Sequence, residues 1–199
     1  MVIHEAIVSK VKSVDNIIPL TTGGQPVVFV ESGQRIKKNK KKPRHGIIDT
    51  AKDWIVQIDL RRRQAQFPPH IITTAERPDL VLYSDSTKVF VMIELTSPAE
   101  DNLEKWREVK AAKYERLAEN IREGGGWKVY VFTIEVGARG FVANRTAGVW
   151  RQLGLGEKEG RKLIDTVSRT AIRCSHFIWL CRNSLEWTAP KHAAVNGDG

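Results

Sequence analysis

The sequence has few of the residues that usually build a disulfide framework or a zinc centre. Its only two cysteines, Cys174 and Cys181, lie seven positions apart in a segment with helical periodicity. A helix would separate their Cα atoms by about 10 Å, which is too far for a disulfide bond, so we expect two small buried or half-buried thiols. The five histidines are scattered without paired ligand spacing, which argues against a zinc site.

Long apolar runs and nucleotide-binding loops are also missing. No segment reads as a secretory signal peptide or a membrane span, and neither a Gly-rich phosphate loop nor a Gly-x-Ser-x-Gly elbow occurs. These absences predict an intracellular protein that does not contact a membrane. With 199 residues, 41% of them hydrophobic, the chain can form one domain with its own core. We place that domain at residues 1–190 and expect a disordered tail over 191–199.

Basic charge is concentrated in one short run. Seven lysines and arginines and no acidic residue occur between Arg35 and Arg44, in a chain whose formal net charge is +9. Such a run repels itself, so we predict a mobile loop over 33–46 that contacts DNA phosphates, serves as a nuclear-localisation signal or is simply solvated. Arg139, in a predicted turn, is either a further phosphate contact or an ordinary surface residue. The phosphate-contacting candidates in the loop are Lys37, Lys38, Lys40, Lys41, Lys42 and Arg44.

The most informative stretch lies between Arg77 and Tyr114. Within it, two runs rich in β-branched and aromatic residues, 80–83 and 89–96, flank a polar turn at 84–88. This pattern predicts an antiparallel hairpin. Along 89–96 both alternating faces are largely apolar, which is typical of a strand covered on both sides.

Two acidic residues face one another in this hairpin. With the turn centred between Ser86 and Thr87, Asp79 lies directly opposite Glu94, which we expect to be buried. Like charges in this position repel, so one carboxyl must bind a proton or a cation must lie between them. Two carboxylates and the backbone carbonyl of Leu95 form an oxygen-only site that suits Mg²⁺ or Mn²⁺. The alternative is Asp79 in solvent and Glu94 held by a lysine or arginine.

A helix is expected directly after the hairpin. Ser97, Pro98 and Glu100 form a capping box with proline at the first helical position, and the glycines at 124–126 must end the helix. Lys110 lies in the stripe that packs on the sheet, so its side chain either extends to the edge of the core or meets the acidic pair. The stripe comprises Leu103, Trp106, Lys110, Tyr114, Leu117 and Ile121.

The order of these residues resembles the PD-(D/E)xK nuclease motif. Pro78-Asp79 and Glu94-Leu95-Thr96 match its acidic elements, with Thr96 at the usual lysine position. The KAAKY run at 110–114 resembles the variant in which that lysine has moved to the following helix, as in the restriction-like endonuclease domain of site-specific non-LTR retrotransposons. Residues 77–84, 93–102, 110–114 and 124–141 also look like segments of transposon-derived open reading frames of animal genomes. The similarity covers roughly the middle half of the chain and part of its C-terminal region.

We therefore expect an α/β fold with a mixed central sheet flanked by helices, similar to that of restriction endonucleases. A strand over 54–60 would neighbour the hairpin, and a strand over 127–136 would follow the helix. A strand, a helix and a second strand of these lengths permit a right-handed crossover, so the last strand would run parallel to a hairpin strand. Further helices are expected at 147–153 and along an apolar stripe that ends at Cys181.

The resemblance implies a metal-dependent endonuclease that hydrolyses phosphodiester bonds in DNA and derives from a mobile element. The catalytic residues would be Asp79, Glu94, Lys110, Lys113 and Tyr114. Either lysine would orient water or brace the phosphate, and the tyrosine would position that lysine or the backbone. Families of this kind often add an acidic residue to the metal site, for which Asp53 and Asp59 are both available.

Two other interpretations stay open. Because Thr96 stands where the motif has lysine, the chain could be a catalytically inactive nucleic-acid-binding remnant. It could also be an intact core that needs the rest of a larger transposon polyprotein to recognise its DNA target.

Overall fold

The computed structural model describes residues 2–15, 17, 45–59, 67–97 and 103–184. In chain order its elements are helix α1 (Val2–Lys12), the 3₁₀ helix η1 (Ile47–Thr50), strands β1 (Ile55–Ile58), β2 (Leu80–Ser84) and β3 (Val89–Thr96), helix α2 (Leu103–Gly125), strand β4 (Lys128–Glu135), and helices α3 (Thr146–Leu153) and α4 (Glu157–Cys181). The basic run from Arg35 to Arg44, the capping residues Pro98 and Glu100, and the tail over 191–199 lie outside the described residues.

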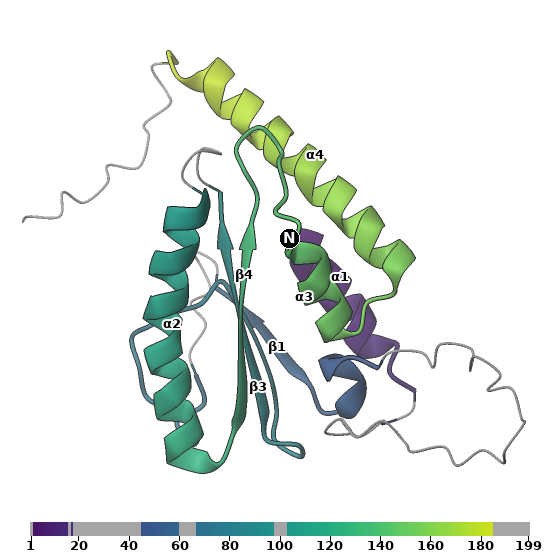
Figure 1. Ribbon diagram of the computed structural model, residues 1–199, viewed down its shortest axis with the longest axis vertical. Helices are drawn as coiled ribbons and strands as arrows, with labels where there is room; N and C mark the ends of the chain where they lie inside the picture. Colours follow the sequence, from purple (N-terminus) through teal and green to yellow (C-terminus); the bar gives the residue numbers. More distant parts are fainter. Residues whose placement is uncertain (1, 16, 18–44, 60–66, 98–102, 185–199) are drawn as a thin grey trace, which may run out of the picture.

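The four described strands form one mixed sheet in the order β1-β2-β3-β4 (Figure 1). The first three are successive antiparallel neighbours, whereas β4 pairs with β3 in parallel after the long helix α2. The α/β class, the hairpin and the parallel strand after a helical crossover are thereby confirmed. The sheet places the start of β2 and the ends of β3 and β4 at one end, since β2 runs opposite to the other two.

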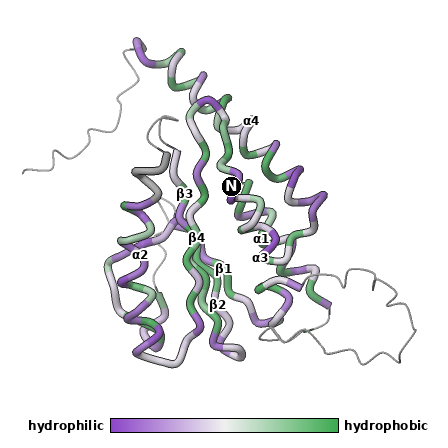
Figure 2. The backbone as a smooth tube through the Cα atoms, viewed as in Figure 1, coloured by the Kyte–Doolittle hydropathy of each residue, from purple (hydrophilic) through white to green (hydrophobic). Residues whose placement is uncertain are grey.

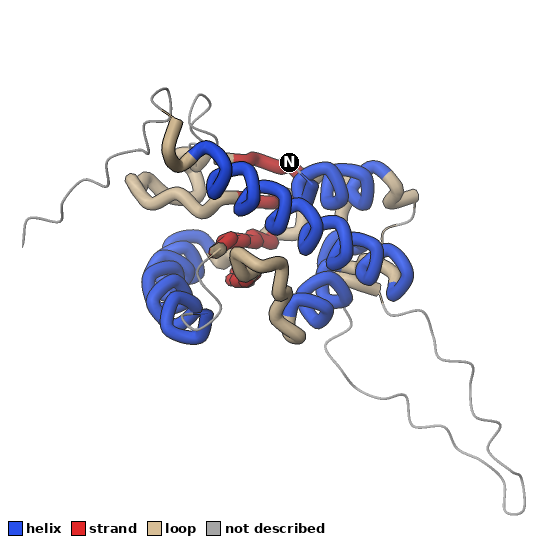
Figure 3. Tube along the Cα trace, turned by 90° about the horizontal axis from the view of Figure 1, so that it is seen from above, coloured by secondary structure: helices blue, strands red, loops and turns tan. Residues whose placement is uncertain are grey.

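The sheet separates two apolar cores. Helix α2 covers one face, where Phe90 and Met92 of β3 pack with Tyr114 and Ile121 of the helix. Helices α1, α3 and α4 lie on the opposite face, as Figures 1 and 3 both show. Apolar residues accordingly concentrate along the strands between the two helical layers (Figure 2). The alternation predicted for 89–96, with one residue set facing each way, is confirmed.

Helix α1 is a feature that the patterns above do not predict. Its charged residues interrupt any apolar run, but Ile3 and Ile7 recur four positions apart and are both buried in the second core. This spacing puts them on one helical face while the charges remain outside. This apolar pattern rests on two buried residues, so the helix is stabilised mainly by tertiary packing against the core.

Helix α4 extends past the end of the sheet (Figure 1). Leu163 near its start is buried, but farther along the same stripe Cys174 is exposed and Ile178 is 51% exposed. The expectation of a buried or half-buried thiol is therefore wrong for Cys174, because that turn of the helix lies beyond the core. Cys181 is half-buried and both thiols are free. Within the described ranges, no helix combines the length and apolar character that crossing a bilayer requires.

Candidate functional site

The acidic pair lies at the end of the hairpin that is remote from its turn. Leu80 pairs with Ile93, so the next position outward sets Asp79 opposite Glu94. Glu94 follows Phe90 and Met92 on the face that packs against α2 and is buried, as expected from the alternation. The register predicted from the turn and the burial of Glu94 predicted from the alternation are both confirmed.

Backbone amides hold the two carboxylates in this arrangement. The amide of Leu95 donates a hydrogen bond to Asp79 Oδ2 at 2.7 Å, and the amide of Asp79 points to Glu94 Oε2 at 3.4 Å. Burial raises the pKa of Asp79, the Leu95 amide opposes the change, and the charge of Glu94 adds to it. Burial and the charge of Glu94 thus disfavour the ionised form of Asp79, and a nearby cation would stabilise that form.

Lys110 supplies a positive charge at this position. Its Nζ atom lies 2.5 Å from Glu94 Oε1, and the two side chains are 29% and 5% exposed. Of the two orientations expected for Lys110, the structure shows the one in which it meets the acidic pair. A glutamate held by a lysine was the alternative to a metal site, and it describes the observed contact.

Tyr114 and Lys113 anchor the chain that leads into Asp79. The hydroxyl of Tyr114 donates to the carbonyl oxygen of Arg77 at 3.0 Å and accepts a hydrogen bond from Lys113 Nζ at 3.2 Å. The same ammonium lies 4.7 Å from the centre of the Tyr114 ring. Burial and the nearby charge of Glu94 raise the pKa of Tyr114, so the phenol stays protonated and can donate. Lys110 therefore contacts the acidic pair, whereas Lys113 contacts the tyrosine.

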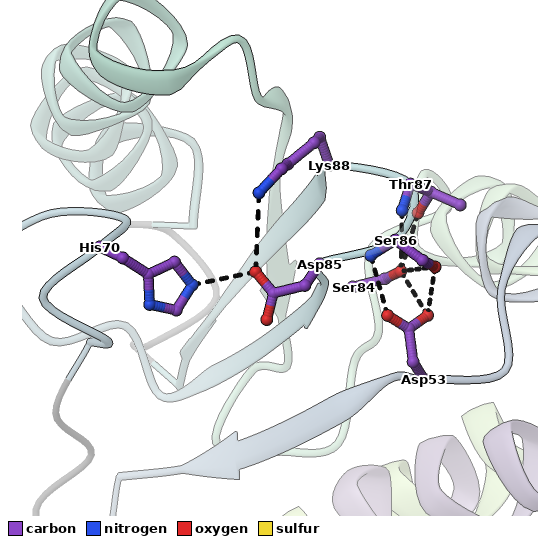
Figure 4. Close-up of polar contacts among 7 residues, drawn as sticks. All are labelled: Asp53, His70, Ser84, Asp85, Ser86, Thr87 and Lys88. Atoms are coloured by element: carbon purple, nitrogen blue, oxygen red, sulfur yellow. Dashed lines mark hydrogen bonds and ion pairs between the residues drawn. The ribbon is translucent and has the colours of Figure 1, made fainter.

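Asp59 and Asp53 occupy opposite ends of the hairpin. The amide of Asp59 donates to the carbonyl oxygen of Asp79 at 3.0 Å, and its charge contributes to the raised pKa of Asp79. Asp53 instead bonds to Ser84 and Ser86 at the hairpin turn (Figure 4). Only Asp59 of these two lies near the acidic pair.

Asp53 clamps the turn through three hydrogen bonds. It accepts from Ser84 Oγ at 2.7 Å, from Ser86 Oγ at 2.6 Å and from the Ser86 amide at 2.9 Å (Figure 4). Burial acts to raise the pKa of Asp53, but these hydrogen bonds outweigh it and lower the pKa from 3.8 to about 2. Since the turn sets the strand register, this clamp supports the alignment of Asp79 with Glu94 from a distance.

Asp53→Asn is expected to lower the free energy of unfolding by about 1 kcal/mol at pH 7, because a largely exposed carboxylate loses charge-assisted hydrogen bonds. A pKa depressed in the folded state stabilises the protein above pH 3.8, and this contribution is lost as the pH falls through about 2. Urea unfolding of both proteins between pH 7 and pH 2 measures the difference. An equal difference at both ends of this range would contradict the clamp.

A second polar cluster lies beside the acidic pair and was not predicted. Glu135 on β4 is fully buried; its Oε1 atom accepts from Thr133 Oγ1 at 2.8 Å and its Oε2 atom from Arg145 Nε at 2.9 Å. The parallel register pairs it with Thr96. A glutamate that interrupts the apolar alternation of β4 is the only sequence signal for this cluster, and the partner Arg145 is ten residues away. The predicted phosphate contact Arg139 is exposed in the turn that follows β4.

The donors at the end of the sheet are compatible with a hard divalent cation. Asp79 and Glu94 supply carboxylate oxygens, and the carbonyl of Leu95 leaves β3 on the same side as its amide, which bonds to Asp79. Asp79 and Thr96 also contribute to the lining of a recess of about 530 Å³ between the sheet and helices α1 and α4. Among the described side chains, no group of three or more His, Cys, Asp or Glu residues could hold a metal ion. Backbone, water or substrate oxygens would have to complete the coordination.

No protein-family model matches the chain, and no curated protein matches it.

Proposed function

We propose that this protein is a metal-dependent endonuclease that hydrolyses phosphodiester bonds in DNA on a restriction-endonuclease-like fold. The observation that carries the proposal is the convergence of Asp79, Glu94 and Lys110 at the open end of the sheet, with Lys110 Nζ 2.5 Å from Glu94. Two carboxylates can bind a metal ion, and an ammonium group can stabilise the charge that develops on a phosphate during phosphodiester hydrolysis. The order of these residues along the chain resembles the PD-(D/E)xK motif.

In this proposal Asp79, Glu94 and the carbonyl of Leu95 hold Mg²⁺ or Mn²⁺. The bound ion would lower the pKa of a water molecule and neutralise charge on the scissile phosphate. Asp79 is suited to the role because burial and the neighbouring Glu94 disfavour an uncompensated charge there, as its raised pKa reflects. Asp59, one hydrogen bond away from Asp79, can bind an outer water molecule.

Lys110 has two tasks in this site. Its ammonium neutralises Glu94 in the structure. If Glu94 held a metal, the ammonium could instead orient the attacking water or contact the phosphate. Its stem comes from the face of α2 that packs on the sheet, so this change needs only side-chain rotation. Tyr114 acts indirectly, because its hydroxyl fixes the carbonyl of Arg77 and so the approach of the chain to Asp79.

DNA is the proposed partner because the chain carries a large excess of basic residues, concentrated between Arg35 and Arg44. The same run suits a nuclear-localisation signal, so the proposal includes activity in the nucleus. The resemblance of the hairpin, the KAAKY helix and β4 to transposon-derived reading frames supports an origin from a mobile element.

The second candidate is a catalytically silent DNA-binding remnant of such a domain. Two observations favour it: Thr96 replaces the usual lysine, and Glu94 already has a cationic partner in Lys110. In that case the ion pair would be purely structural and Mg²⁺ would have no effect on the protein.

Nicking of a supercoiled plasmid separates the two functions. Purified wild-type protein is incubated with the plasmid in Mg²⁺, Mn²⁺ or EDTA, and open-circular product is quantified. The endonuclease converts the plasmid only with a metal, whereas the remnant binds DNA with a steep salt dependence and leaves it supercoiled under every condition.

A further inference from the structure

We propose that Arg145 binds a phosphate that flanks the scissile bond, and that the buried Glu135 positions it for this purpose. The inference rests on the proposed nuclease function and adds a substrate-binding residue to it. Arg145 belongs to none of the motifs of the hairpin or the KAAKY helix. It comes from the connection between β4 and α3.

Glu135 binds one guanidinium group. It is fully buried, and each of its two carboxylate oxygens has a defined partner, Thr133 on one side and Arg145 on the other. Burying an ionised carboxylate costs free energy unless the carboxylate is paired. The ion pair with Arg145 offsets this cost for Glu135. The arginine side chain is nevertheless 41% exposed, so part of it is accessible to solvent.

The sheet places this pair next to the catalytic end of β3. In the parallel register Glu94 is level with Thr133, and Thr96 is level with Glu135. All four side chains share the face toward α2, because they alternate with the positions that fill the other core. From the strand spacing and the rise of two residues, the Cα atoms of Glu94 and Glu135 are about 8 Å apart. The carboxylate that holds Arg145 therefore lies one strand across and two residues along from Glu94.

Arg145 also supplies charge at a position where the motif lacks it. Thr96 stands at the usual lysine position, and its neighbour across the sheet is the carboxylate that holds the guanidinium. A guanidinium matches the geometry of phosphate oxygens with two parallel donors, and an arginine tethered by a carboxylate loses less entropy on binding. The pair Lys110 and Arg145 would then contact the scissile phosphate and its neighbour, respectively.

A purely structural role makes a different prediction. The connection after β4 is also fixed by the backbone bridge between Val136 and Val142 and by the bond from the Ala143 amide to the Glu135 carbonyl. If Arg145 only ties this connection to the sheet, replacing it lowers stability and leaves the electrostatics of DNA binding unchanged. The salt dependence of binding therefore distinguishes the two roles.

The test is equilibrium binding of a fluorescent DNA duplex in EDTA at several salt concentrations, with wild type, Arg145→Gln, Arg145→Lys and the control Arg151→Gln. Arg151 is an exposed arginine on α3. Loss of one phosphate contact in Arg145→Gln should weaken binding several-fold and reduce the slope of log K against log salt by about 0.9. Arg145→Lys should restore the slope, and Arg151→Gln should leave it at the wild-type value.

An unchanged slope in folded Arg145→Gln overturns the inference, as does an equal loss in Arg151→Gln. Neither result bears on whether the wild-type protein nicks DNA, which the plasmid assay measures separately. Glu135→Gln tests the positioning role, because it keeps the shape of the side chain and removes its charge. Glu135→Gln should weaken binding, and Glu135→Gln with Arg145→Gln should bind no more weakly than Arg145→Gln alone. Additive losses in the double variant would contradict coupling between the two side chains.

Discussion

Glu94→Gln is expected to reduce metal-dependent nicking to the background seen in EDTA. The substitution preserves the shape of a side chain that is only 5% exposed but removes the charge that would bind the metal. Stability without metal should change by no more than about 1 kcal/mol, because loss of the partly exposed ion pair with Lys110 is offset by relief of the repulsion from Asp79. Initial nicking rates and urea unfolding in EDTA measure the two effects.

Glu119→Gln is the matched control, since Glu119 is an exposed glutamate on α2 and should behave as wild type in both assays. A loss of about 3 kcal/mol or more in Glu94→Gln would identify Glu94 and Lys110 as a structural ion pair. Nicking by Glu94→Gln at the wild-type rate would remove Glu94 from the reaction.

Lys110→Met is expected to act in opposite directions on catalysis and on metal binding. Nicking should slow by about 10² or more, because a positioned ammonium is lost from the transition state. The affinity for Mn²⁺ should rise about tenfold, equivalent to about 1.4 kcal/mol, because the ammonium no longer competes for Glu94 Oε1. Single-turnover nicking and a calorimetric Mn²⁺ titration give the two quantities.

The matched control is Lys113→Met, whose lysine contacts Tyr114 instead of the acidic pair. It should leave the Mn²⁺ affinity at the wild-type value and slow nicking less than Lys110→Met does. If both lysine variants nick at the wild-type rate, the ammonium has not migrated from position 96 to the helix, and Lys110 only neutralises a buried glutamate.

The hairpin shows how far the sequence alone predicts this fold. A polar turn between two β-rich runs sets a register, and a register sets which residues share a face, so the opposition of Asp79 and Glu94 follows from local rules. The parallel pairing of β4 follows from chain connectivity, because a 23-residue helix separates it from β3. These features depend on the period of the apolar residues and on the lengths of the segments, both of which can be read from a single sequence.

Other parts of the site depend on which side chains meet across the fold. The periodicity of α2 predicts that Lys110 lies on the inner face, but its ammonium could either extend to the edge of the core or contact the acidic pair. The packing of the helix against β3 brings it to Glu94. Arg145 and Glu135 meet because the chain turns back along β4, which no local pattern indicates. Asp53 and Asp59 look equivalent in sequence, yet β1 carries them to opposite ends of the hairpin.

Binding of Mn²⁺ followed by electron paramagnetic resonance tests the central claim most directly, because it reports on the acidic pair without requiring a DNA target. The wild-type protein should bind one Mn²⁺ per chain, Mg²⁺ should displace it, and both Asp79→Asn and Glu94→Gln should abolish it. Absence of binding to folded wild-type protein, or binding that persists in both variants, would contradict a metal site at Asp79 and Glu94.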